Sequence, residues 1–136
     1  MKTSTIFIVD DTPHVCDLVQ KVVNHLYPEK EVLTFEDGVE AAACLETTTP
    51  ELIITDIQMA EFSGYELVKL VYEQFAQETI PIILLSALAA NNDDLHIRNT
   101  LESKGLPRLP ILSKPVNVRD LQEQITQALD NQIQAV

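Results

Sequence analysis

Reactive side chains lie at the ends of several short apolar segments of this chain. They are the acidic pair Asp10-Asp11, a further carboxylate at Asp56, the hydroxyl of Ser86 and the amine of Lys114. In parallel α/β sheets, functional groups gather at the carboxyl ends of the strands. If the apolar segments are neighbouring strands, these groups share one edge of a sheet although they are far apart in sequence.

Such a cluster suits the chemistry of phosphoryl transfer. Carboxylates placed close together repel each other, and a hard divalent cation such as Mg²⁺ or Mn²⁺ relieves this repulsion through oxygen ligands. A carboxylate is also a competent nucleophile toward phosphorus. A metal ion and a lysine supply positive charge, and a hydroxyl can donate a hydrogen bond to a phosphoryl oxygen. The set would therefore suffice to make and break an acyl phosphate.

Each of these residues is weak evidence by itself. An acidic pair or a lone Asp after a strand often serves only to cap the helix that follows. A lone Ser or a lone Lys-Pro pair carries almost no information about function. The conjunction favours a functional site, because each group follows a different apolar segment.

The pattern of apolar residues predicts the elements that position these side chains. Apolar runs indicate strands, and helical periodicity indicates helices between them. Thr12 and Asn117 are expected helix N-caps, and Gly105 is an expected C-cap. Five alternating units predict an α/β fold with helices on both faces of a parallel sheet. The predicted strands cover 6–9, 31–35, 52–54, 82–85 and 111–112. A helix is predicted over 91–104, and the apolar residues of the other predicted helices run from 15 to 26, from 39 to 45, from 67 to 75 and from 118 to 129.

Composition narrows the class of protein. A chain of 136 residues fits one domain, and its 46% hydrophobic content excludes a disordered chain. No apolar run approaches a membrane span and no signal peptide is visible, so we expect a cytoplasmic protein. The net charge of −12 argues against nucleic-acid binding by this domain and favours protein partners and cations. Cys16 and Cys44 are expected to be reduced and partly buried.

Together the motifs resemble those of bacterial response-regulator receiver domains, including the stand-alone chemotaxis type. The resemblance spans about residues 4–130 and implies a single receiver domain over 1–136. It also implies a flavodoxin-like (βα)5 three-layer sandwich with strand order 2-1-3-4-5. The motifs that carry it are Ile8-Val9-Asp10-Asp11, Ile54-Thr55-Asp56 with Met59 and Gly64 following, Leu84-Leu85-Ser86-Ala87, and Lys114-Pro115.

The resemblance also implies roles for the site residues. Asp56 would be the phosphorylated residue, and the backbone carbonyl of Gln58 would bind Mg²⁺ or Mn²⁺ together with Asp10, Asp11 and Asp56. Lys114 would pair with the phosphoryl group.

Ser86 would move toward the phosphate, and the Lys114-Pro115 peptide would be cis. The implied donor is a sensor histidine kinase or phosphotransfer protein, and the output is an unidentified protein target or a homodimer. The domain would catalyse only its own phosphorylation and dephosphorylation.

Four features depart from the family pattern. Ile111 stands where many relatives have Tyr or Phe, so an aromatic rotamer switch is not carried over. The stretch between Ser86 and Lys114 is longer than usual, Ala60 replaces a common proline, and Gln58 occupies a variable position that affects the lifetime of the phosphate.

Three other functions remain open at this point. One is a receiver-like adaptor that binds its partner without phosphorylation. Another is a phosphatase of the haloacid-dehalogenase type. A chain that resembled that family would have an Asp-x-Asp motif, whereas Asp10 and Asp11 are adjacent. A flavodoxin-like FMN protein is the third, although the acidic pair would repel the cofactor's phosphate.

Overall fold

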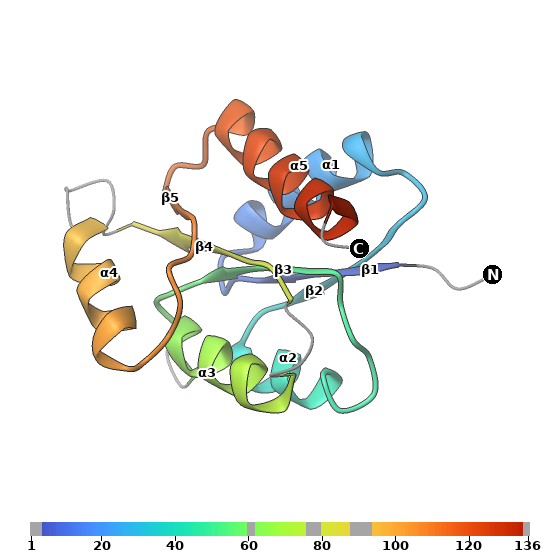
Figure 1. Ribbon diagram of the computed structural model, residues 1–136. Coiled ribbons are helices and arrows are strands. Elements are labelled where there is room, and N and C mark those ends of the chain that lie inside the picture. The colour runs from blue at the N-terminus through green and yellow to red at the C-terminus, as the bar shows by residue number, and fades with distance from the viewer. Residues whose placement is uncertain (1–3, 60–61, 76–79, 88–93, 135–136) are drawn as a thin grey trace.

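The computed structural model describes residues 4–59, 62–75, 80–87 and 94–134 of the chain. Five strands form one parallel sheet in the order β2-β1-β3-β4-β5 (Figure 1). The predicted α/β, flavodoxin-like fold and its strand order are therefore confirmed. The strands are β1 (Thr5–Val9), β2 (Glu31–Phe35), β3 (Leu52–Asp56), β4 (Ile82–Ser86) and β5 (Ile111–Ser113).

Among the described residues, five helices cover the two faces of the sheet and complete three layers. Helices α1 and α5 pack on one face, and α2, α3 and α4 pack on the other (Figure 1). None of the helices in the described part of the chain has the length and apolar character needed to cross a bilayer. The helices are α1 (Pro13–Leu26), α2 (Gly38–Cys44), α3 (Gly64–Gln74), α4 (Asp94–Ser103) and α5 (Val118–Gln134).

The central strands are buried on both faces, which explains their continuous apolar sequences. Successive side chains of a strand point to opposite faces. In β1, Ile6 and Ile8 pack against α1 and α5, whereas Phe7 and Val9 pack against the helices of the other face. The sheet therefore separates two hydrophobic cores and holds the ends of β1, β3 and β4 in fixed positions.

The helix ends agree with most of the expected caps. Asn117 accepts a hydrogen bond from the Asp120 amide at 3.0 Å, and Gly105 has a left-handed φ of +70° after α4. Thr12 occupies the N-cap position of α1, but its side chain makes no capping hydrogen bond. The Thr12 amide donates a hydrogen bond to the Asp10 carboxylate at 2.8 Å, so the turn before α1 fixes the position of this acidic side chain.

Helix boundaries differ slightly from the predicted ones. Leu45 and Phe75 follow the last helical residue as C-caps rather than ending α2 and α3. Helix α4 spans Asp94–Ser103, and the predicted start at Asn91 lies outside the described residues. Such shifts are expected, because helix termini fray and the pattern of apolar residues does not fix them.

Candidate functional site

The register of the sheet brings the reactive side chains to one edge. Val9 of β1 pairs with Thr55 of β3, so Asp10 and Asp56 follow side by side. One carboxylate oxygen from each of Asp10, Asp11 and Asp56 lies within 4.8 Å of the others. The three acidic residues predicted from the sequence therefore form one cluster.

Lys114 reaches this cluster from the end of β5. Its Nζ atom lies 2.8 Å from Asp10 Oδ2 and 3.1 Å from Asp56 Oδ2. Burial by itself would lower the pKa of Lys114, but its close contacts with the Asp10 and Asp56 carboxylates outweigh this effect and raise the pKa. Lys114 is consequently a persistent cation at the centre of the acidic cluster. The Lys114-Pro115 peptide is cis, as predicted.

Ser86 ends β4 beside the same cluster. It pairs with Ser113 of β5, and its carbonyl accepts a hydrogen bond from the Lys114 amide at 3.0 Å. The Ser86 residue is fully buried. This backbone hydrogen bond therefore holds Ser86, the last residue of β4, next to Lys114, which directly follows β5.

Asp56 is almost completely buried, with 4% of its surface exposed. Its Oδ1 atom accepts a hydrogen bond from the Gln58 amide at 3.1 Å. Burial and, next, the charge of Asp10 raise the pKa of Asp56, and Lys114 offsets only part of this effect. An ionised Asp56 is thus unfavourable here unless more positive charge is supplied.

Asp10 shows most directly that the site suits a cation. Its Oδ2 atom is buried and has no partner in hydrogen-bond geometry among the described residues. The 2.8 Å contact with Lys114 is an ion pair. Three carboxylates with one contacting ammonium leave negative charge in excess, and hard divalent cations prefer such oxygen ligands. Asp10, Asp11 and Asp56 therefore fit a magnesium ion, with the exposed Asp11 on the solvent side.

The sequence of the chain matches a known protein family. Residues 6–126 match the response regulator receiver domain family. The chain belongs to this family. Its fold, the acidic cluster and the match over most of its length agree, and they place the chain among two-component signalling proteins.

Relatives of this receiver occur in chains of very different length. An uncharacterized 14.6 kDa protein of Leptolyngbya boryana is 36% identical over 65% of this chain and 66% of its own length. Hybrid signal transduction histidine kinase D of Dictyostelium discoideum is 33% identical over 64% of this chain and 5% of its own length. The receiver thus spans less than two thirds of these curated relatives. Receiver segments like it accompany histidine kinases.

A solved structure supports the fold of this receiver independently. The CheY-like response regulator receiver domain protein from Methanospirillum hungatei superimposes with a TM-score of 0.81. The two sequences are 24% identical, and the alignment covers 99% of this chain and 100% of the other. At this sequence identity, the likeness between the two structures shows a shared fold.

Two residues of this receiver support the site without having been assigned that role from the sequence. The Cys16 thiol of α1 donates a hydrogen bond to the Asp10 carbonyl at 3.3 Å. Gly64 begins α3 where a side chain would collide with the backbone of Asp56 and Ile57. The position of Cys16, in the first turn of the helix after Asp10-Asp11, is the signal that could have indicated its contact.

Two details of the predicted site stay predictions. The backbone carbonyl of Gln58 stays a predicted metal ligand, since the contact found here is made by the Gln58 amide. The replacement of a common proline by Ala60 concerns a residue outside the described part of the chain.

Proposed function

We propose that Asp56 is the phosphoacceptor of a signalling switch that takes a phosphoryl group from a histidine kinase or phosphotransfer protein. The observation that carries this proposal is the contact of Lys114 Nζ with both Asp56 and Asp10, beside the Asp11 carboxylate. A nucleophilic carboxylate, a fixed cation and an oxygen-rich cation site are the parts that phosphoryl transfer requires.

In the proposed reaction, a carboxylate oxygen of Asp56 attacks the phosphorus of a phosphohistidine. An O–P bond forms, the N–P bond of the donor breaks, and the imidazole leaves with the electron pair and takes up a proton. Lys114 would pair with an oxygen of the transferred group, and the Ser86 hydroxyl would donate a hydrogen bond to it. Hydrolysis of the acyl phosphate by water would restore Asp56.

The metal site would be formed by Asp10, Asp11, Asp56 and the Gln58 carbonyl. A bound Mg²⁺ or Mn²⁺ ion would neutralise charge on the phosphoryl oxygens. The chain's own contribution is to hold Asp10 through the Thr12 amide, so that its carboxylate stays in place as an ion enters.

The proposal extends to the domain as a whole, its compartment and its partners. We take residues 1–136 as one receiver domain with its core at about 4–130, acting in the cytoplasm together with a sensor kinase. The output would be a downstream protein target or a homodimer. The net charge of −12 supports protein partners over nucleic acid.

Incubation with acetyl phosphate and Mg²⁺ tests the phosphoacceptor directly. The intact protein should gain the mass of one phosphoryl group, and Asp56→Asn should gain none. Asp17→Asn, an exposed carboxylate on α1, is the matched control and should be phosphorylated like the wild type. If no phosphorylation is found with acetyl phosphate or with any histidine kinase, the proposal is wrong.

Ile111 gives a reason to test a second function, an adaptor that works without phosphorylation. Ile111 is partly buried and packs against the core that contains α4, in the place where an aromatic residue was expected from the family. For an adaptor, the affinity for the partner would be the same in Asp56→Asn and would not respond to Mg²⁺. For the proposed switch, the affinity should change with phosphorylation.

A further inference from the structure

The backbone carbonyl of Asp10 lies at the point where the chain leaves β1 and the sheet. The Asp10 amide still continues the backbone hydrogen bonds of the sheet, because it donates to the Phe35 carbonyl at 3.0 Å. The Asp10 carbonyl, in contrast, receives no backbone amide from the residues that the structure describes. Asp10 is fully buried, and a buried carbonyl without a donor is costly. This carbonyl therefore needs a donor from a side chain.

The thiol of Cys16 is that donor. Cys16 Sγ donates a hydrogen bond to the Asp10 carbonyl at 3.3 Å, and the contact is buried. Helix α1 holds the donor in place, because the Cys16 amide donates to the Thr12 carbonyl at 3.2 Å. The Cys16 side chain also packs into the core beneath α1 and α5. The first turn of α1 thus places a thiol over the end of β1.

The acceptor oxygen belongs to the peptide group that joins Asp10 to Asp11, two residues of the acidic cluster. A peptide group is planar and rigid, so a hydrogen bond to its oxygen restricts the backbone of both residues. The Asp10 carboxylate is additionally held by the Thr12 amide at 2.8 Å. Asp11 is exposed, so the direction of its carboxylate depends mostly on the backbone that carries it. Fixing this peptide group therefore orients two carboxylates at once.

We propose that Cys16 is a positioning residue of the metal site, whose thiol fixes the Asp10-Asp11 peptide group so that both carboxylates face one ion. The inference rests on the proposed function, because the site that it prepares is the proposed magnesium site. Cys16 acts through the peptide oxygen and does not bind the ion itself. Without the thiol, the buried carbonyl would lack a donor, and the peptide group would turn to find another one.

Calorimetric titration with Mg²⁺, in the absence of a phosphoryl donor, tests this role. Cys16→Ala removes the donor and should weaken Mg²⁺ binding by about tenfold, as is usual when a hydrogen-bond partner of a metal ligand is lost. Cys16→Ser keeps a donor on a side chain of similar size and should restore most of that affinity. Cys44→Ala is the matched control, because it removes a thiol on the other face of the sheet and should bind Mg²⁺ like the wild type.

Two results of this titration would overturn the inference alone. One is equal Mg²⁺ affinity in the wild type and Cys16→Ala. The other is equally weak binding by Cys16→Ser and Cys16→Ala, because the size of the side chain rather than its hydrogen bond would then matter. Both results leave the phosphoacceptor proposal standing, since the mass of the phosphorylated protein tests that proposal separately. A wild type that binds no Mg²⁺ would refute the proposed metal site together with this inference.

Infrared spectroscopy tests the hydrogen bond even if Cys16→Ala does not fold. In the Cys44→Ser variant, Cys16 carries the single remaining thiol, so the S–H stretching band reports on it alone. A thiol that donates a hydrogen bond absorbs at lower frequency than a free thiol, and we expect the lower frequency for Cys16. A band at the frequency of a free thiol would overturn the inference, because the Asp10 carbonyl would then have no donor in Cys16.

Discussion

A Cβ atom added to Gly64 would lie 2.5 Å from the backbone carbonyl oxygen of Asp56. It would also lie 2.8 Å from the Cα atom of Ile57, and both neighbours are backbone atoms that cannot turn away as a side chain can. The Gly64 amide in turn donates to the Ile57 carbonyl at 2.8 Å. The start of α3 is therefore in direct contact with the segment that presents the proposed phosphoacceptor.

Gly64→Ala should for this reason disturb both stability and the site. We expect a loss of about 1–3 kcal/mol in the free energy of unfolding, which is usual for overpacking. Urea unfolding measures this loss, and titration with Mg²⁺ should show weaker binding. Gly105→Ala is the control: its φ of +70° strains an Ala, but no atom lies within 4 Å of the added Cβ. That variant should lose stability while its Mg²⁺ affinity stays unchanged.

Asp56 should make the stability of the metal-free protein depend on pH. Burial and Asp10 raise the pKa of Asp56 above its ordinary 3.8. Between 3.8 and the pKa of the folded state, the folded protein keeps a proton that the unfolded chain has released, so the free energy of unfolding falls as the pH rises. Relative to Asp56→Asn, the wild type should therefore become less stable with rising pH across this window.

Urea unfolding in EDTA at several pH values checks this dependence. The comparison of wild type with Asp56→Asn cancels the contributions of the other carboxylates. A constant difference between wild type and Asp56→Asn at every pH would contradict the assignment of the raised pKa to Asp56.

Magnesium should stabilise the folded protein through the acidic cluster. A ligand that binds only the folded state at one hundred times its Kd adds about 2.7 kcal/mol to the free energy of unfolding. Asp11 is exposed, so Asp11→Asn should fold normally and yet lose most of the rise in Tm that Mg²⁺ produces. Glu123→Gln, an exposed carboxylate on α5, should retain the full rise. Equal rises in both variants would place the ion elsewhere.

Cys16 should react slowly as long as the protein is folded. Burial of the thiol, followed by the charge of Asp10, raises the pKa of Cys16 from 9.0 to about 11. Because the thiolate is the reactive form, alkylation of the Cys44→Ser variant by iodoacetamide should be slow near pH 8 and increase toward pH 11. The folded state holds its thiol proton more tightly, so the stability contributed by Cys16 is lost as the pH rises from 9.0 to about 11.

The Cys16→Ser variant provides the comparison for this measurement. Its remaining thiol, Cys44, is only partly buried, so iodoacetamide should reach it more easily and alkylate it faster than Cys16 at the same pH. Rapid alkylation of Cys16 at neutral pH without unfolding would show that the thiol is neither buried nor bound to the Asp10 carbonyl.

The fold could be predicted from the sequence because its strong signals are local. Strands β1, β3 and β4 are buried on both faces and therefore appear as continuous apolar runs. The acidic cluster followed from the rule that parallel strands end at the same edge. Lys114 was placed at that edge, but its simultaneous contact with Asp10 and Asp56 depends on the register of β5, which no local pattern specifies.

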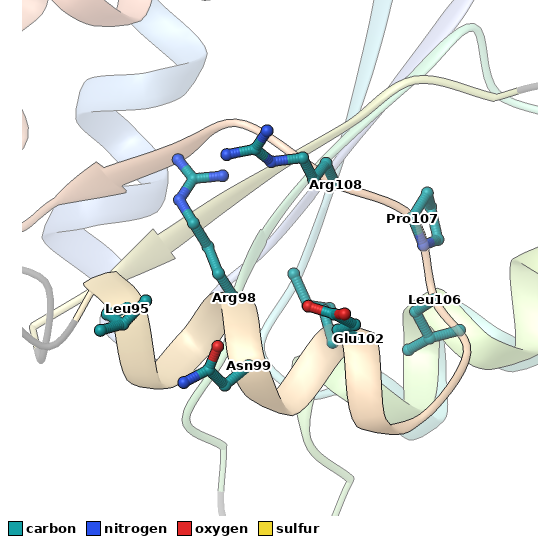
Figure 2. Close-up of a pocket in the computed structure, with 8 residues that line it drawn as sticks. Leu95, Arg98, Asn99, Glu102, Leu106, Pro107 and Arg108 are labelled. Carbon is teal, nitrogen blue, oxygen red and sulfur yellow. The ribbon is translucent and has the colours of Figure 1, made fainter.

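Other parts of the site depend on packing that the sequence does not encode locally. The Thr12 residue was a reasonable N-cap, yet the neighbouring Asp10 carboxylate takes the hydrogen bond of the Thr12 amide. Gly64 was recognised only as part of a motif, whereas the structure shows its close approach to Asp56. A groove beside α4 (Figure 2) arises from where the segment before β5 passes over that helix, a long-range relationship.

The order in which the site residues occur along the chain has a consequence for synthesis. A ribosome releases Asp10, Asp11 and Asp56 well before Lys114, which directly follows the last strand. Until β5 adds to the sheet, a nascent chain holds the acidic residues without the ammonium group that pairs with two of them. The ammonium contact shared by Asp10 and Asp56 can therefore form only after the end of β5 has docked on the sheet.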